Sequence, residues 1–281
     1  MHLGAIGSDF VRWNSLGEQS ILVTIDGLEN NEKLSKNFKK VINKKCIISN
    51  KDSYSNFYIT KDPNCSSLLE PNISEYKKWY ASHRIKLNKK IKVKVSSINR
   101  FLRENKINYI DWLVIDIQGL DLKVVKSLDP KIRNKISMIE LEPGFSPVYK
   151  GSDRIGDVFN YMSKCFEFAD MQFGHNYRIQ NETLDVLEKK VLFRLTKPSQ
   201  FYANVTFTNK NQKNIRISLM KLIYLILNNN IIEARNFLNN NLKDSKFTKL
   251  INKNLNQKIF ILKIIYCFSL PFYLIKKILK F

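Results

Sequence analysis

Hydrophobic residues in the first two thirds of the chain occur in short runs that alternate with amphipathic or polar stretches. Residues 21–25 form an apolar, β-branched run that ends in Asp26-Gly27, and residues 112–117 form the strongest run of this kind. Short apolar runs are typical of parallel strands that are covered on both faces. Their alternation with helical segments predicts an α/β fold with a doubly wound, Rossmann-like sheet.

Weaker patterns complete this alternation. Further strands are expected over residues 46–48, 57–60, 91–95, 136–141, 166–171 and 191–195. Helices are expected over residues 10–16, 97–103, 121–127 and 154–164, and the polar stretch after Gly27 is also predicted to be helical. Ser97 is placed to cap the helix that follows it, because a serine hydroxyl accepts hydrogen bonds from the first helical amides.

The pattern changes near residue 200. We therefore predict a main domain over residues 1–198 and a basic, mainly helical region over residues 199–281, with a helical hairpin formed by residues 219–227 and 231–238. The apolar tail over residues 259–275 is interrupted by Lys263 and Pro271, and a spanning helix needs about 20 apolar residues. Docking of the tail against the main domain and a cationic membrane-surface anchor over residues 259–281 both remain open.

The charge of the chain is strongly unbalanced, with 47 Lys and Arg against 25 Asp and Glu, a formal net charge of +22. A surface of this kind favours anionic partners, but a Lys-, Asn- and Ile-rich composition also results from codon bias. The four scattered cysteines form no metal or redox motif, and the N-terminus has no signal-peptide pattern. These features predict a cytoplasmic protein, with peripheral membrane contact as the alternative.

Glycines and carboxylates at the expected strand ends are the first candidates for a binding site. The segment Gly4 to Gly7 is a Gly-x-x-Gly turn, and Asp26 follows Gly4 after 22 residues, at the end of the next strand. Glycines in such a turn allow a ligand to approach the backbone closely. A carboxylate at this spacing is placed to accept the two hydroxyl hydrogens of a ribose.

A second set of carboxylates follows the strongest apolar run. Asp116 and Glu142 are expected at the same edge of neighbouring strands, where open α/β sheets bind ligands. Asp121 is predicted to cap a helix and Glu140 to be an exposed strand residue. His83 and His175 are expected on the surface, and the spacing of Asp116, Asp121 and Glu142 does not indicate a metal site.

Several of these segments resemble the FkbM methyltransferase family. Residues 113–121 are similar to its signature Leu-Lys-Ile-Asp-Val-Glu-Gly-x-Glu, and residues 142–149 resemble its Glu-x-x-Phe-x-Pro-x-Tyr element. Residues 66–68 match its Ser-Ser-Leu loop, and residues 97–101 are similar to its Thr-Leu-Asp-x-Phe segment. The resemblance covers about residues 1–172, and the order and spacing of the motifs make it specific.

The resemblance implies a Rossmann-like fold and S-adenosylmethionine as the methyl donor. Gly4, Ala5 and Gly7 would line the methionine end of this cofactor, Asp26 its ribose, and Ser49 to Asp52 its adenine. Asp116 would face the reacting centre, with Asp116 or Glu142 as the catalytic base. The sequence departs from the family at His2, which occupies an acidic position, and at Gln118, which replaces Glu. The first strand is therefore expected to be truncated or the cofactor site altered.

These observations predict an S-adenosylmethionine-dependent O-methyltransferase that acts on a hydroxyl of a glycan or small metabolite. The first alternative is a non-catalytic Rossmann-like module whose basic C-terminal region binds a polyanion or a membrane surface. The second is an RNA methyltransferase. The sequence contains neither the Asn/Asp-Pro-Pro-Tyr element of base-amino methylases nor a Pro-Cys nucleophile pair, which argues against a nucleic-acid substrate.

Overall fold

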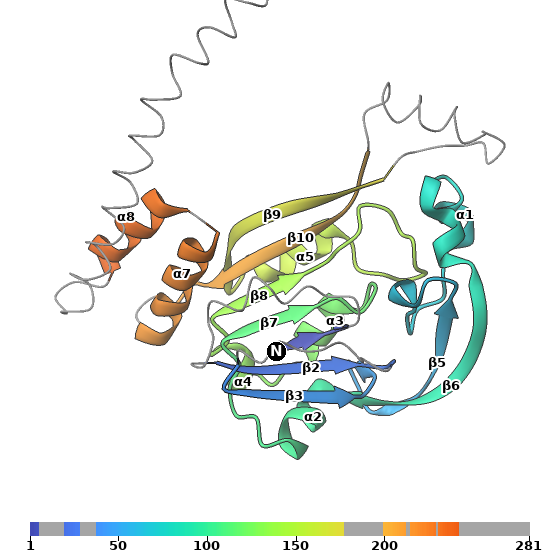
Figure 1. Ribbon diagram of the computed structural model, residues 1–281, viewed down its shortest axis with the longest axis horizontal. Helices are drawn as coiled ribbons and strands as arrows, with labels where there is room; N and C mark the ends of the chain where they lie inside the picture. Colours follow the sequence, from blue (N-terminus) through green and yellow to red (C-terminus); the bar gives the residue numbers. More distant parts are fainter. Residues whose placement is uncertain (6–19, 29–37, 177–198, 212–213, 229, 242–281) are drawn as a thin grey trace, which may run out of the picture. The chain divides into compact units, whose positions relative to one another are not determined.

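The computed structural model describes residues 1–5, 20–28, 38–176, 199–211, 214–228 and 230–241 (Figure 1). The chain forms two compact units, Met1–Lys210 and Asn211–Phe281. Five of the sequence-based expectations lie wholly or partly outside the described residues: the helix over 10–16, residues 29–37 of the polar stretch after Gly27, the strand over 191–195, Gly7 and the tail over 259–281.

The centre of the first unit is a seven-stranded sheet in the order β3-β2-β1-β7-β8-β10-β9 (Figure 1). Its strands are β1 (His2–Leu3), β2 (Ile21–Asp26), β3 (Lys40–Lys45), β7 (Trp112–Ile115), β8 (Met138–Leu141), β9 (Phe166–Asn176) and β10 (Ser199–Asn209). The first five strands of this order pair in parallel with their neighbours, and β10 runs antiparallel to β8 and β9. This is the predicted Rossmann-like α/β fold.

The strand order reverses at β1, in the middle of the sheet. His2 of β1 pairs with Thr24 of β2 on one side and with Val114 of β7 on the other. The strand is only two residues long, yet it joins the two halves of the sheet. Ligands of open α/β sheets bind outside the carboxyl ends of the strands at such a reversal. A ligand site is therefore expected at the carboxyl ends of β1 and β7.

The segments with the clearest apolar runs form the inner strands β2 and β7, whereas β3 was not predicted. Residues 40–45 were expected in a polar helical stretch, but they pair in parallel with β2 from Ile21 to Asp26. β3 ends the sheet, and its lysines and asparagine are largely exposed. Lysine is common on edge strands because its charge prevents pairing with another chain, and it hides the apolar alternation that identifies a strand.

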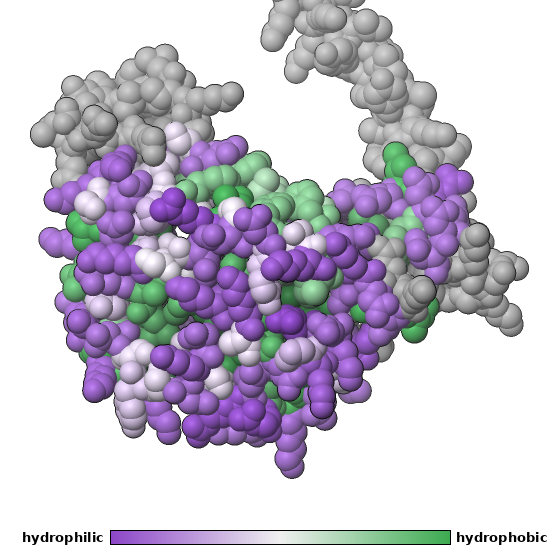
Figure 2. Space-filling view, turned by 180° about the vertical axis from the view of Figure 1, so that it is seen from behind, coloured by the Kyte–Doolittle hydropathy of each residue, from purple (hydrophilic) through white to green (hydrophobic). Residues whose placement is uncertain are grey.

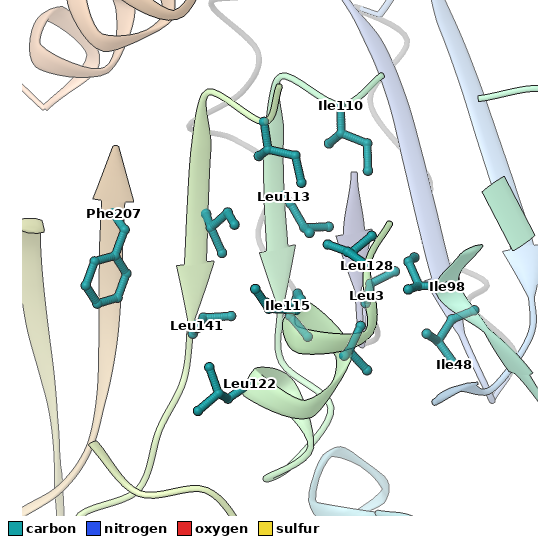
Figure 3. Close-up of a cluster of buried hydrophobic side chains, with 14 of the residues drawn as sticks. Leu3, Ile48, Ile98, Ile110, Leu113, Ile115, Leu122, Leu128, Leu141 and Phe207 are labelled. Carbon is teal, nitrogen blue, oxygen red and sulfur yellow. The ribbon is translucent and has the colours of Figure 1, made fainter. Parts of the chain in front are cut away.

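Helices α2 (Ile98–Glu104), α3 (Asp121–Ser127), α4 (Pro130–Arg133) and α5 (Ile155–Met162) connect the strands. Ser97 caps α2 as predicted, since its Oγ accepts a hydrogen bond from the Arg100 amide at 3.3 Å. The core between strands and helices consists of aliphatic side chains, among them Leu3, Ile115, Leu122, Leu128 and Leu141 (Figure 3). Burial of this apolar surface holds β1 and β7 at the centre of the unit.

A smaller sheet lies between β3 and α2 in the sequence. It contains β4 (Ile48–Ser49), β5 (Ser53–Thr60) and β6 (Leu87–Ser97) in the order β4-β6-β5, so the expected strand over residues 91–95 is part of a longer one. The connection from β5 to β6 holds two 3-10 helices, Pro63–Cys65 and Tyr80–Ile85, and the short helix α1 (Ile73–Tyr76). Tyr58 of β5 pairs with Ser67 of this connection. This pairing fixes the Ser-Ser-Leu loop beside β5.

The position of β10 corrects the expected domain boundary. Residues 199–209 were assigned to the C-terminal region, but Val205 to Thr208 pair with β8, and β10 pairs with β9 along its length. Ala203, Val205 and Phe207 of β10 are buried in the main core. The first unit therefore extends to Lys210.

The described part of the second unit is a pair of helices, α7 (Ile215–Leu227) and α8 (Ile231–Asn241), which pack against each other. This is the predicted hairpin around Asn228. Among the described residues, none of the helices combines the length and the apolar character that a bilayer crossing requires.

The surface of the described residues is mainly hydrophilic in the view of Figure 2, with small hydrophobic patches between the polar side chains. Exposed lysines of β3 and β6 contribute to this polar surface. The first unit thus combines a hydrophobic core with a charged exterior, as expected for a chain with 26% charged residues.

Candidate functional site

A cavity lies at the carboxyl ends of β1, β2 and β7, at the reversal of the strand order. It has about 660 Å³ of empty volume, part of it open to solvent. Its lining combines glycines and carboxylates from the strand ends with an apolar wall. Gly4, Asp26 and Asp116, three of the residues singled out from the sequence, contribute to this lining.

Gly4 brings the backbone of the first turn against the end of β7. Its φ is +74°, a conformation that favours glycine, and its amide donates a hydrogen bond to the Ile25 carbonyl oxygen at 2.9 Å. A Cβ at this position would overlap the carbonyl oxygen of Asp116. Asp116 is held from the same side, because its own amide donates to the Leu3 carbonyl oxygen at 3.0 Å. Only glycine permits this approach.

Asp26 ends β2 and turns into the loop that follows. Its Oδ1 accepts a hydrogen bond from the Leu28 amide at 2.8 Å, which orients the carboxylate at the rim of the cavity. Gly27 lies against Ile47 so closely that a Cβ would have to displace this side chain. Asp26 therefore ends β2, and both Asp26 and Gly27 line the cavity.

One wall of the cavity is apolar. It includes Ile47, Ile48 and Phe57, which come from the segment around β4 and from β5. Ser66, Ser67 and Leu68 of the Ser-Ser-Leu loop line the cavity as well. Small-molecule sites commonly combine apolar side chains with a few polar groups in this way.

The structure gives Asp52 a different position from the one expected. Its carboxylate accepts hydrogen bonds from the Ser97 amide at 2.9 Å and from the Ser97 hydroxyl at 3.0 Å. The hydrogen bond from the backbone of Ser97 is the main reason why the pKa of Asp52 lies below its usual value. Asp52 does not line the cavity, and neither does Ala5, whereas Gly4 and Ile48 do. Asp52 thus stabilises the start of α2.

Asp116 and Glu142 form a hydrogen-bonded pair of carboxyl groups. Burial, followed by the charge of Asp116, raises the pKa of Glu142 to about 10, and burial also raises the pKa of Asp116 above its usual value. Two carboxyl groups in contact hold a proton between them because both cannot ionise at low cost. At neutral pH the pair therefore shares a proton, and Asp116 is the member that lines the cavity.

Asp121 joins the ends of β7 and β8. It was expected as a helix cap, but it is the first residue of α3, and its carboxylate accepts hydrogen bonds from two loop amides instead. These are the amide of Ile117 at 3.0 Å and that of Glu142 at 3.3 Å. Burial raises the pKa of Asp121 well above its usual value. Asp121 fixes the spacing between Asp116 and Glu142, a role that its sequence position did not indicate.

Gln118 and Tyr149 extend the hydrogen bonds around Asp116. Gln118 Nε2 donates to Asp116 Oδ1 at 2.7 Å, and the Tyr149 hydroxyl lies 2.9 Å from Gln118 Oε1. The same hydroxyl lies 2.8 Å from the carbonyl oxygen of Cys65. Gln118 thereby links Asp116, in the segment 113–121, to Tyr149, the last residue of the segment 142–149.

The remaining candidates lie away from the cavity. His83, in the 3-10 helix Tyr80–Ile85, is exposed, and His175 is near the end of β9, with its ring 6.4 Å from that of Phe173. Glu140 was expected to be exposed, but it is buried on β8, an inner strand of the sheet. In the described part of the chain, no group of three or more His, Cys, Asp or Glu side chains is arranged to hold a metal ion.

Comparison with known families gives one match. The family model described as "Methyltransferase FkbM domain" matches residues 5–178. No curated protein and no solved structure matches the sequence. The matched region contains Asp26, Asp116 and Glu142, together with the residues of the apolar wall.

Proposed function

The chain belongs to the FkbM methyltransferase family, and we propose on this basis that it is an S-adenosylmethionine-dependent O-methyltransferase. The observation that supports this function best is the cavity at the reversal of the strand order, where Gly4, Asp26 and Asp116 come together. The acceptor in this proposal is a hydroxyl group of a glycan or of a small metabolite.

The residues of the cavity suit the parts of S-adenosylmethionine. Asp26 at the end of β2 would accept hydrogen bonds from the ribose hydroxyls, and the wall of Ile47, Ile48 and Phe57 would contact the adenine. The close approach of Gly4 to Asp116 leaves backbone rather than a side chain at the methionine end. When bound, this cofactor supplies a methyl group on a positively charged sulfur.

Asp116 is the proposed catalytic base. A hydroxyl is a weak nucleophile until its proton is withdrawn, and a base within about 3 Å assists this step. Asp116 would take the proton of the acceptor hydroxyl, whose oxygen would then receive the methyl group that the bound cofactor supplies. Glu142, which is protonated at neutral pH, donates a hydrogen bond to Asp116 and keeps it oriented.

Binding of S-adenosylmethionine, measured by calorimetry, tests the cofactor assignment. We expect the Asp26→Asn variant to bind roughly tenfold or more weakly than the wild type, because hydrogen bonds to a charged group contribute about 1.5–3 kcal/mol. The side-chain oxygen of the introduced asparagine would still accept the hydrogen bond from Leu28, so the loop should be retained.

The matched control is Asp52→Asn. Asp52 belongs to the same family-like region but does not line the cavity, so this variant should bind S-adenosylmethionine as the wild type does. Equal weakening in both variants would contradict the assignment of the ribose to Asp26. Absence of binding by the folded wild type would contradict the enzymatic function and favour the non-catalytic module.

A further inference from the structure

The side-chain amide of Gln118 lies between two groups of different chemistry. Its nitrogen donates to the Asp116 carboxylate at 2.7 Å, and its oxygen lies 2.9 Å from the Tyr149 hydroxyl. The backbone of Gln118 is in the left-handed region, with φ +56°, and the Ser67 hydroxyl donates to its carbonyl oxygen at 2.9 Å. With the backbone held in this way, rotation about the last side-chain bond is the easiest change open to the amide.

The protons around Tyr149 do not suffice for all contacts in this orientation. Tyr149 has a single hydroxyl proton, yet the two oxygens next to it, from Cys65 at 2.8 Å and from Gln118 at 2.9 Å, are both acceptors. One of the two contacts therefore lacks a proton while the amide nitrogen faces Asp116. In this orientation only two hydrogen bonds connect the groups between Asp116 and the Cys65 carbonyl. One runs from Gln118 to Asp116, and the other is the single bond that the Tyr149 hydroxyl can donate.

A half-turn of the amide removes this shortage. Gln118 Nε2 would then donate to the Tyr149 oxygen, and the Tyr149 proton would go to the Cys65 carbonyl oxygen. Gln118 Oε1 would face Asp116, which is favourable when Asp116 has a proton to donate. In this state three hydrogen bonds connect Asp116 with Cys65, and each donor has an acceptor.

We propose that Gln118 is a positioning residue whose amide orientation follows the protonation of Asp116. The nitrogen faces Asp116 when this residue is ionised, and the oxygen faces it when it is protonated. The inference rests on the proposed role of Asp116 as the base. It explains how Asp116 keeps a hydrogen-bond partner both before and after it takes the proton of the acceptor, and the rotation itself transfers no proton.

The surroundings of Asp116 act in the same direction. The ionisable groups with which it interacts electrostatically are Asp26 of β2, Cys65, Asp121 of α3, Glu142, Tyr149 and Tyr202 of β10. Burial and then the charge of Asp26 raise the pKa of Asp116, because both favour its protonated form. A glutamate at position 118, as in the family signature, could accept but not donate while ionised, so it could not alternate in this way.

Two variants should move the titration of the Asp116–Glu142 pair in opposite directions. Tyr149→Phe removes the extra hydrogen bond of the protonated state, so the apparent pKa of the pair should fall by roughly 0.5–1 unit. Gln118→Glu places another carboxylate beside Asp116, so the apparent pKa should rise by about one unit or more. The measurement is ¹³C NMR titration of the side-chain carboxyl carbons in the full chain, which requires neither cofactor nor turnover.

Tyr76→Phe is the matched control. Tyr76 belongs to the same buried cluster as Tyr149, but the groups that influence its pKa besides burial are Cys65, Arg84 and Asp62, and neither Gln118 nor Asp116 is among them, so the titration should not shift. Shifts of the same sign in Tyr149→Phe and Gln118→Glu, or no shift in either, would overturn the proposal. These results would leave the binding of S-adenosylmethionine unaffected, and that separate experiment decides the proposed function.

The wild-type protein gives a second test if Tyr149→Phe does not fold. Nuclear Overhauser effects between the Gln118 amide protons and the Tyr149 ring should become stronger as the pH is lowered through the titration of Asp116. The amide protons face Tyr149 only in the protonated state. The same pattern above and below this pH would exclude the rotation.

Discussion

Replacement of Asp116 by asparagine should reduce kcat/KM for methyl transfer by about 10²–10⁴-fold, the range that general-base catalysis contributes. The introduced asparagine has the shape of aspartate but cannot take up the proton of the acceptor hydroxyl. The backbone bond from residue 116 to Leu3 does not involve the side chain and should remain. Release of S-adenosylhomocysteine in the presence of an acceptor that the wild type methylates measures the effect.

Glu142→Gln is the variant with which Asp116→Asn should be compared. Since the pKa of Glu142 is raised to about 10, this residue is neutral at pH 7, and glutamine preserves both its shape and its hydrogen bond to Asp116. We expect a loss of less than roughly tenfold, because a neutral donor replaces a neutral donor. Unchanged turnover in Asp116→Asn would remove Asp116 from the mechanism, and a larger loss in Glu142→Gln would exchange the two roles.

The pH dependence of turnover tests the same role of Asp116. Asp116 acts as a base only when it is ionised, and burial raises its pKa above the usual value for aspartate. Activity should therefore fall as the pH is lowered through this raised pKa, rather than only near the pKa of an exposed aspartate. The binding of S-adenosylmethionine by the Asp116→Asn variant should not show this fall at low pH.

The central part of the fold could be predicted because burial on both faces leaves a simple trace in the sequence. β2 is mostly apolar and β7 entirely so, because neighbouring strands and helices cover them. β3 has one neighbour and exposed lysines, so its composition resembles that of a solvated helix. β10 was assigned to the wrong region because the change in charge near residue 200 does not coincide with the end of the sheet.

The site could be predicted where its residues follow strands. Asp26 and Asp116 directly follow buried β-branched residues, and the parallel order of the sheet then brings them to one edge. Asp52 comes shortly after the end of β4, but β4 belongs to the smaller sheet, and the carboxylate of Asp52 accepts a hydrogen bond from Ser97 instead. The expected cleft thus contains Asp26 and Asp116, with Glu142 hydrogen-bonded to Asp116.

Hydrogen bonds between loops that are distant in the sequence could not be predicted from a single sequence. Asp121 accepts from an amide 21 residues away, and Tyr149 lies beside a carbonyl 84 residues away. The sequence position of Asp121, at the start of a helix, equally fits a cap. A carboxylate that is buried and bonded to two loops differs from an exposed cap only in three dimensions.

Replacement of Gly4 by alanine should damage both the fold and the cofactor site. Two effects add at this position: the φ of +74° is unfavourable for alanine, and the new Cβ would overlap the Asp116 carbonyl oxygen. The first effect costs about 1–2 kcal/mol. The second forces β1 and β7 apart in a close-packed region, so a total loss above about 4 kcal/mol in the free energy of unfolding is expected. Urea denaturation followed by circular dichroism measures this loss.

Gly151→Ala separates the two effects. Gly151 also has a φ of +74°, but nothing lies within 4 Å of the position that its Cβ would take. This variant should lose only the conformational part, about 1–2 kcal/mol, and should bind S-adenosylmethionine normally. If both variants lost the same stability, the backbone contact between Gly4 and Asp116 would not be needed. A soluble but unfolded Gly4→Ala chain beside a folded Gly151→Ala chain would instead show that the approach of these two backbones is essential to the sheet.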